Sequence, residues 1–264
     1  MKAEVLYLTV SGLKTRVLKY GSGTPILFLH GWGCKAETMA GIVPALSDSF
    51  SCYLIDFPGF GESEVPQTVW KVSDYASFTI ALIQQLKIEG CHVLAHSFGC
   101  RVMLTLLSNP ETSPLFKKVL ITGGAGLKPR RKPSFYVRKY TALTLKFPFQ
   151  FLPGSFREKG LAWLRKTSLW KKLGSSDYAV LDGVMRQIFV NVVGEFQDDI
   201  LSKISHEVFL LWGENDDATP IDQAKRLEKG IKRATLVTIS DAGHYAFIDQ
   251  PVRFNAIARA YFVG

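Results

Sequence analysis

Six short apolar runs constrain the fold of this chain more than any other feature of its sequence. They are continuous rather than alternating, as expected of parallel strands that are covered on both faces. The runs are residues 26–29, 52–55, 93–94, 119–121, 208–212 and 236–239. Apolar residues at helical spacing separate most of them, over residues 36–46, 73–86, 98–107, 221–229 and 251–262, and Ser73 is the expected cap of its helix. The sequence therefore predicts repeated strand–helix units in one sheet.

The beginning of the chain has a different pattern. Residues 4–10 and 14–20 alternate in polarity on either side of Ser11-Gly12, which predicts an antiparallel hairpin with one face in water. Together with the six apolar runs, this hairpin gives an α/β fold. We expect a mostly parallel sheet of eight strands with helices on both faces.

The strand–helix alternation stops after Gly123 and resumes near Glu195. We therefore predict an inserted helical cap, or lid, at residues 124–192, on a core made of residues 1–123 and 193–264. The insertion holds 14 Lys and Arg against 3 Asp and Glu, a net charge of +11. The rest of the chain holds 18 basic and 20 acidic residues, so the net charge of +9 comes entirely from the insertion.

Basic and apolar residues follow one another within the insertion. Its basic cluster is Lys128, Arg130, Arg131 and Lys132, and the apolar residues after it are Tyr136, Tyr140, Leu143, Phe147, Phe149, Phe151 and Leu152. A lid over an acyl chain needs such apolar side chains, and a basic rim would attract an anionic head group or an anionic lipid surface. The alternative is a soluble lid whose aromatic residues pack on the core and whose lysines keep it in solution.

Composition narrows the class of protein. Of the 264 residues, 47% are hydrophobic, which indicates a globular chain, yet no apolar run approaches the ~20 residues of a membrane span. The amino terminus lacks the apolar centre of a signal peptide, and the four cysteines have no paired spacing, so we expect a cytoplasmic protein. Neither a metal nor another cofactor is expected. Cys91, His92, His96 and Cys100 lie close in sequence, but strand alternation and a following turn separate them.

The segment Ala95-His-Ser-Phe-Gly99 lies where a buried strand turns directly into a helix. Such a corner leaves no room beside the turn, so the residues two positions on either side of the serine must be small, as Ala95 and Gly99 are. The turn would aim the hydroxyl of Ser97 at the positive end of the following helix. An ordinary capping serine at a tight turn is the alternative for these five residues alone.

Four further motifs follow the ends of other predicted strands. They are His30-Gly-Trp-Gly33, Asp56-Phe-Pro-Gly-Phe-Gly-Glu-Ser63, Trp212-Gly-Glu-Asn-Asp-Asp-Ala-Thr-Pro220 and Asp241-Ala-Gly-His244. In their order and context they resemble the α/β-hydrolase superfamily over essentially the whole chain. The chain departs from the family's pattern at Ala95 and Cys100, where the family usually has glycine, although both replacements are small.

The resemblance implies a catalytic triad of Ser97, His244 and Asp216, in the chain order of this fold. A serine hydroxyl needs a base to take its proton, and an imidazole that a carboxylate holds in one tautomer does this at neutral pH. The family's spacing selects Asp216 over its neighbour Asp217, and no carboxylate follows the sixth strand. The backbone N–H groups of Trp32 and Phe98 are the expected oxyanion hole. The other histidines, His30, His92, His96 and His206, are interpreted as structural.

The expected activity is that of a serine hydrolase, which cleaves a carboxylic ester or thioester of a small or acyl-chain substrate through an acyl-enzyme. Candidate pocket residues are Trp32, Phe147, Phe149 and Tyr245. The same triad would serve a C–C bond or lactone hydrolase, and a ligand-binding or receptor protein on this fold is an alternative of another class. We expect a small-molecule partner and weak contact with an anionic lipid surface through the basic cap. No nucleic acid is expected, because the chain has no aromatic–basic RNA motif.

Overall fold

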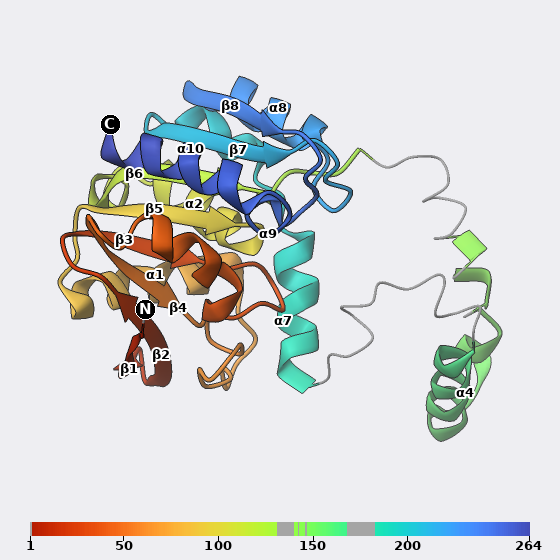
Figure 1. Ribbon diagram of the computed structural model, residues 1–264. Coiled ribbons are helices and arrows are strands. Elements are labelled where there is room, and N and C mark those ends of the chain that lie inside the picture. The colour runs from red at the N-terminus through yellow and green to blue at the C-terminus, as the bar shows by residue number, and fades with distance from the viewer. Residues whose placement is uncertain (1, 131–139, 142, 146, 168–182) are drawn as a thin grey trace. The chain divides into compact units, whose positions relative to one another are not determined.

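The computed structural model describes residues 2–130, 140–141, 143–145, 147–167 and 183–264. The chain divides into two compact units, which are coloured by residue number in Figure 1. The core unit comprises Met1–Lys128 and Val190–Gly264, and the inserted unit comprises Pro129–Phe189. The inserted unit falls within the expected insertion at residues 124–192, whose role as a cap stays a prediction.

One eight-stranded sheet forms the centre of the core unit (Figure 1). Its strands, in chain order, are β1 (Glu4–Val10), β2 (Leu13–Tyr20), β3 (Thr24–Leu29), β4 (Phe50–Ile55), β5 (Cys91–His96), β6 (Phe116–Thr122), β7 (Glu207–Gly213) and β8 (Arg233–Ile239). Their order across the sheet is β1-β2-β4-β3-β5-β6-β7-β8. The pairs β1–β2 and β2–β4 are antiparallel, and the other pairs are parallel. The predicted hairpin and the mostly parallel sheet are confirmed.

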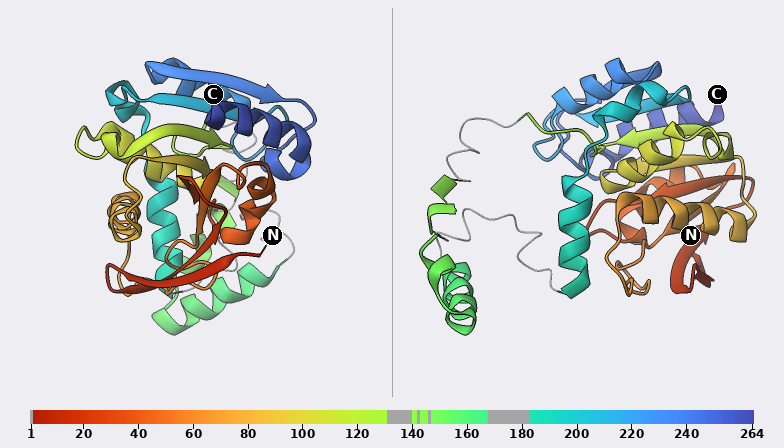
Figure 2. Two further views of the ribbon diagram at one scale, coloured as in Figure 1. Left: turned by 60° about the vertical axis from the view of Figure 1, so that its left-hand side comes forward. Right: turned by 180° about the vertical axis from the view of Figure 1, so that it is seen from behind.

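Helices cover both faces of this sheet, as two further views show (Figure 2). The 3₁₀ helix η1 (Ala36–Ala45), α9 (Ala246–Asp249) and α10 (Pro251–Val263) pack together on one face, where their buried side chains join those of β3 and β4. The helices α1 (Val72–Leu86), α2 (Phe98–Ser108), α8 (Ile221–Gly230) and the 3₁₀ helix η4 (Asp198–Lys203) pack on the other. The remaining described helices are the short η2 (Ser113–Leu115), η3 (Phe147–Phe151), α4 (Gly154–Lys166) and α7 (Gly183–Gly194). None of the helices that the structure describes is long and apolar enough to span a membrane.

The helix predicted at residues 36–46 is present as the 3₁₀ helix η1, which contains Gly41 and Pro44, two residues that disfavour an α-helix interior. The predicted cap of the next helix is wrong. Ser73 does not cap α1, because this helix begins at Val72 after Lys71. The carboxylate of Asp74 instead accepts a hydrogen bond from the Lys71 N–H (2.7 Å), which ties the entry of the chain to the first turn.

Candidate active site

Ser97 lies at the corner where β5 ends and α2 begins, in a backbone conformation that L-residues rarely adopt (φ 49°, ψ −106°). Such a conformation costs on the order of 1–3 kcal/mol and persists only where the surroundings enforce it. Here the Ser97 N–H donates to the Thr122 carbonyl (3.2 Å), and the Ser97 carbonyl accepts from the Ala125 N–H (3.1 Å). A side chain on Gly99 would approach the Leu29 carbonyl to 2.4 Å. The corner therefore requires a residue without a side chain at 99.

His244 and Asp216 face each other from the loops that follow β8 and β7. Their atoms Nδ1 and Oδ2 are 2.9 Å apart. A carboxylate only accepts hydrogen bonds, so Nδ1 carries the proton and the lone pair of the imidazole lies on Nε2. This is the tautomer that can remove a proton from a hydroxyl.

Four hydrogen bonds hold the Asp216 carboxylate, whose side chain is fully buried. Oδ1 accepts from the N–H groups of Ala218 (2.9 Å) and Thr219 (2.8 Å), while Oδ2 accepts from the Thr219 hydroxyl (2.8 Å) and from His244. Burial by itself would raise the pKa of Asp216, but the hydrogen bonds from His244 and Thr219 outweigh it and hold this pKa below its ordinary value. The neighbouring Asp217 is exposed.

The two loops can approach each other because Gly213 has no side chain. A Cβ at this position would come within 2.2 Å of the Gly243 carbonyl. Backbone hydrogen bonds link the loops on either side, from Glu214 to Ile239 (3.0 Å) and from Asn215 to Ala242 (2.8 Å). The sheet edge thus fixes the distance between the acid and the histidine.

The loop after β3 lies beside the serine. A Cβ on Gly31 would come within 3.1 Å of the Ser97 Cβ, which places the Gly31–Trp32 peptide against the corner. The Trp32 ring packs edge-on against Phe60 and Phe98, with ring centroids 4.8 and 5.4 Å apart. Phe98 is the first residue of α2, so its N–H is one of those that a helix amino terminus leaves without a partner in the helix. Both predicted oxyanion donors belong to segments next to Ser97.

His96 connects the serine corner with the histidine loop. It precedes Ser97, and its ring centroid lies 4.8 Å from that of His244 and 4.9 Å from that of Tyr245. Burial, more than the neighbouring His244, lowers the pKa of His96 to about 3, so this ring is neutral at neutral pH. Its Nδ1 lies 3.1 Å from the Thr122 carbonyl and donates to it.

The predicted pocket residues fall into two groups. Trp32 and Tyr245 belong to the core unit, and the Tyr245 hydroxyl lies 3.5 Å from the Cys34 thiol of the loop that holds Trp32. Phe147 and Phe149 belong to the inserted unit, in which Phe147 is exposed (58%) and Phe149 packs against Gly160. Their place in a pocket stays a prediction. Of the other residues singled out in the insertion, Arg131, Lys132 and Tyr136 lie outside the described residues.

Two residues at the site carry contacts that the sequence did not indicate. The Thr219 hydroxyl bonds to Asp216 and lies 3.3 Å from Nδ1 of His244. Arg16, on β2, is buried among carboxylates beneath the loop that holds Trp32. Because β2 was predicted to have one face in water, a charged residue on it did not indicate a buried ion pair. The one hint in the sequence was Asp56, which directly follows a buried strand and therefore needs a partner.

Comparison with known proteins places this arrangement in a family. The model of the alpha/beta hydrolase fold matches residues 24–251. The chain belongs to this family. A pimeloyl-[acyl-carrier protein] methyl ester esterase from Aeromonas hydrophila is 25% identical to this α/β-hydrolase, over 96% of this chain and 100% of the relative. A 2-hydroxymuconate semialdehyde hydrolase from Pseudomonas sp. is 23% identical, over 95% and 90%.

Solved structures agree on the fold of this α/β-hydrolase. The esterase from Exiguobacterium antarcticum superposes with a TM-score of 0.75 at 22% sequence identity, over 99% of this chain and 100% of that chain. At this identity the likeness shows the fold alone.

Proposed function

We propose that this α/β-hydrolase cleaves a carboxylic ester or thioester, with Ser97 as the nucleophile, His244 as the base and Asp216 as the residue that orients the base. The observation that carries the proposal is the 2.9 Å contact between Asp216 Oδ2 and His244 Nδ1, which leaves the Nε2 lone pair to act as a base. Two further observations support Ser97 as the nucleophile. Its backbone is strained, and the ring of the preceding residue, His96, packs against the ring of His244.

The reaction would run in two halves. In the first, Ser97 Oγ attacks the carbonyl carbon while its proton passes to His244 Nε2, and the oxyanion accepts hydrogen bonds from the N–H groups of Trp32 and Phe98. The C–O or C–S bond then breaks, and the alcohol or thiol leaves with the proton from His244. In the second half, His244 takes a proton from water, the hydroxide attacks the acyl-enzyme, and the carboxylic acid leaves as Ser97 recovers its proton. These steps involve only groups of this chain and water.

The substrate class follows from the residues that surround this chemistry. Trp32 and Tyr245 flank the serine and the histidine with aromatic rings, which suits an acyl chain better than a polar group. Phe147 and Phe149 would complete the pocket from the inserted unit. The net charge of the insertion favours an anionic ester and a weak contact with an anionic lipid surface. The likeness to a pimeloyl methyl ester esterase is in keeping with an acyl ester.

Hydrolysis of a C–C bond by the same triad is the second candidate. It is favoured by the likeness to a hydrolase that is named for a semialdehyde, a compound without an ester bond. The two candidates share the base and its carboxylate, and they differ in the group that leaves the tetrahedral carbon. A substrate series therefore separates them, whereas a change to the triad does not.

Fluorophosphonate labelling of the wild-type protein and of Ser97→Ala tests the proposal. We expect the wild type to be labelled at Ser97 and to hydrolyse a chain-length series of p-nitrophenyl esters, and Ser97→Ala to lose both with its fold intact. Labelling that persists in Ser97→Ala would contradict the nucleophile. Labelling without ester turnover would favour the C–C bond reaction. A wild type that is neither labelled nor active would favour a ligand-binding role on this fold.

A further inference from the structure

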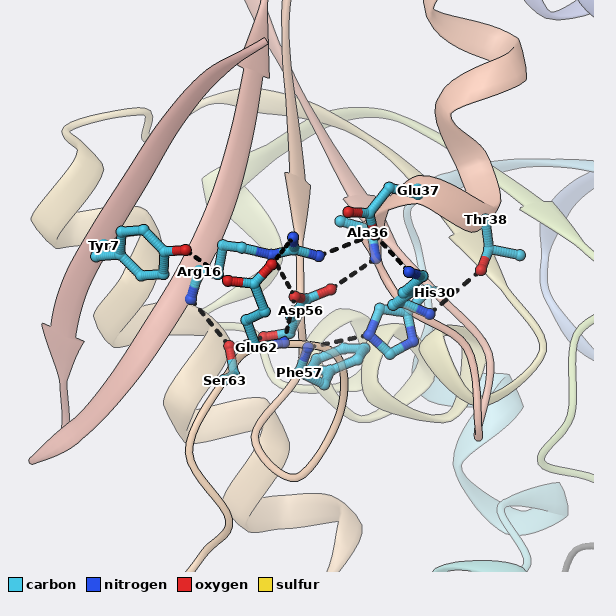
Figure 3. Close-up of polar contacts among 11 residues, drawn as sticks. Tyr7, Arg16, His30, Ala36, Glu37, Thr38, Asp56, Phe57, Glu62 and Ser63 are labelled. Carbon is cyan, nitrogen blue, oxygen red and sulfur yellow. Dashed lines mark hydrogen bonds and ion pairs between the residues drawn. The ribbon is translucent and has the colours of Figure 1, made fainter.

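Arg16 joins three segments of the chain that are far apart in sequence (Figure 3). Its Nε donates to Asp56 Oδ2 (2.6 Å), Nη1 to Glu62 Oε1 (2.5 Å) and Nη2 to Glu37 Oε2 (2.8 Å). The Arg16 side chain is only 6% exposed. Burial would lower its pKa, but the bonds to Asp56 and Glu37 outweigh burial and raise this pKa above its ordinary value. The guanidinium is therefore a fixed positive charge beneath the sheet edge.

Asp56, which is paired with Arg16, binds one end of the loop that contains Trp32. Its carboxylate follows β4 and is completely buried. Oδ1 accepts from the Ala36 N–H (2.7 Å), and Oδ2 accepts from the Glu62 N–H (2.9 Å) as well as from Arg16. A buried carboxylate without a partner is strongly unfavourable, and Arg16 supplies that partner. Ala36 is the residue at which the loop after β3 ends and η1 begins.

The next residue, Phe57, holds the other end of the same loop. Its N–H donates to Nε2 of His30 (3.0 Å), so Nε2 is an acceptor and the proton of this imidazole lies on Nδ1. Nδ1 in turn donates to the Gly31 carbonyl (2.7 Å). His30 is 1% exposed, and burial lowers its pKa to about 4, which keeps this tautomer neutral at neutral pH. Figure 3 shows Asp56 and Phe57 as consecutive residues facing the two ends of the loop.

The hydrogen bond from His30 to the Gly31 carbonyl also sets the direction of the Trp32 N–H. In a trans peptide the C=O and the following N–H lie in one plane and point in opposite directions. The Gly31 carbonyl accepts from His30 on one side and from the Cys34 N–H (3.1 Å) on another. With this carbonyl fixed, the Trp32 N–H can point only to the opposite side of the peptide.

We propose that His30 is a positioning residue for the oxyanion hole: its Nδ1–H holds the Gly31–Trp32 peptide so that the Trp32 N–H faces the reacting carbonyl. Asp56 and Arg16 support it from the far end of the loop. This inference rests on the proposed function, because it needs an oxyanion at Ser97. Oxyanion donors act through being preorganised, and loss of one costs about 10²–10³ in kcat.

Two amide replacements of His30 separate positioning from simple packing. Asn carries its amide at the distance of Nδ1, so His30→Asn can still donate to the Gly31 carbonyl while it loses contact with Phe57. Gln carries its amide at the distance of Nε2, so His30→Gln can still accept from Phe57 but no longer reaches Gly31. Each variant removes one of the two hydrogen bonds of the buried ring. We expect both to lower Tm, since each leaves one buried group without a partner.

Kinetics with p-nitrophenyl butyrate and the rate of fluorophosphonate labelling give the decisive comparison. For His30→Gln we expect kcat and the labelling rate to fall about 10²-fold or more, with KM nearly unchanged. For His30→Asn we expect the same two quantities to fall less than about tenfold. Equal losses in the two variants, or losses that follow Tm rather than the retained bond, would overturn the proposal. An inactive and unlabelled wild type would instead contradict the proposed function.

His92 offers a matched control, because it is also buried and accepts a backbone hydrogen bond, from the Lys118 N–H (3.1 Å), among the rings of Phe50 and Phe262. His92→Gln should lower Tm without lowering kcat. If neither His30 variant folds, Asp56→Asn serves in their place. Its carbonyl oxygen is needed at Oδ2, which accepts from both Arg16 and Glu62, so its NH₂ group faces the Ala36 N–H and loosens that end of the loop. Its kcat must then fall at constant KM, and an unchanged kcat would overturn the proposal.

Discussion

Replacing Asp216 by asparagine is expected to invert the tautomer of His244 while preserving every contact at the site. Oδ1 of Asp216 accepts two backbone hydrogen bonds, from Ala218 (2.9 Å) and Thr219 (2.8 Å). An asparagine must therefore place its carbonyl oxygen there, because an NH₂ group cannot accept. Its NH₂ group then takes the place of Oδ2 and faces His244 and the Thr219 hydroxyl, the two groups that donate to Oδ2 in the wild type.

This change alters the tautomer of His244, the proposed base. An NH₂ group that donates to Nδ1 of His244 forces the imidazole proton onto Nε2, the nitrogen that has to accept the proton of Ser97. The same change in a well-studied serine protease triad lowers kcat by about 10⁴, and we expect a loss on the order of 10³ to 10⁴ here. At about 1.36 kcal/mol for each factor of ten, this corresponds to about 4–5.5 kcal/mol of transition-state stabilisation. Since the hydrogen-bond geometry is retained, Tm should change little.

Steady-state kinetics with p-nitrophenyl butyrate and nitrogen-15 NMR of the histidine ring measure the two effects. Asp217→Asn is the matched control, because Asp217 is adjacent, exposed and carries the same charge. It should keep kcat within a few-fold of the wild type. The reasoning is refuted if Asp216→Asn keeps kcat within tenfold, if its imidazole proton stays on Nδ1, or if Asp217→Asn is the more damaging change.

Three further predictions follow from features of both units. Ser97→Gly should be more stable than Ser97→Ala by about 1–3 kcal/mol in urea unfolding, because glycine accepts φ 49° without strain; equal stabilities would argue against a strained corner. The pKa of His30 is lowered to about 4 and that of His96 to about 3, so the unfolded chain binds more protons below about pH 6.5 and stability should fall as the pH drops through this window. Between pH 6.5 and 5 the loss is about 1.6 kcal/mol for each residue, and urea unfolding of His96→Asn should show roughly half of the pH dependence that these two residues cause. For an anionic ester, kcat/KM should fall as ionic strength rises, while a neutral analogue stays flat; glutamine in place of Lys128 and the basic residues at 130–132 should remove the difference, and equal salt dependence of both esters in the wild type would leave the basic cluster as solubilising charge.

The strands were predictable because most of the apolar runs belong to strands whose side chains are buried. The run at 236–239 differs, because it lies on the edge strand β8 and is mostly half-buried. The spacing of apolar residues at 36–45 does not separate an α-helix from a 3₁₀ helix, so the effect of Gly41 and Pro44 was missed. The cap of α1 was misplaced for a related reason, since Ser73 and Asp74 both favour a helix start and only the backbone geometry decides between them.

Some residues of the candidate site could also be predicted from the sequence, and others could not. The resemblance to the α/β-hydrolase pattern selected Ser97, Asp216 and His244. The structure brings the last two within a hydrogen bond, while their catalytic roles remain predictions. Arg16 could not be found from the sequence, because its three carboxylate partners lie 21, 40 and 46 residues away and nothing local identifies them. The direction of the Gly31–Trp32 peptide likewise depends on contacts between distant segments.

The two chain segments that lead into and out of the inserted unit are fastened to each other within the core unit. The Lys128 N–H donates to Asp198 (2.8 Å), Arg226 donates to the Lys128 carbonyl (2.7 Å) and pairs with Asp198, and the Gln197 N–H donates to the Gly126 carbonyl (2.9 Å). The core unit therefore holds the two flanking segments together through its own hydrogen bonds. Because the entropy of closing a loop grows only slowly with its length, inserts of other lengths and sequences could replace residues 129–189 at little cost to the core. We therefore predict that the insertion can be exchanged as a module while the core unit keeps its fold.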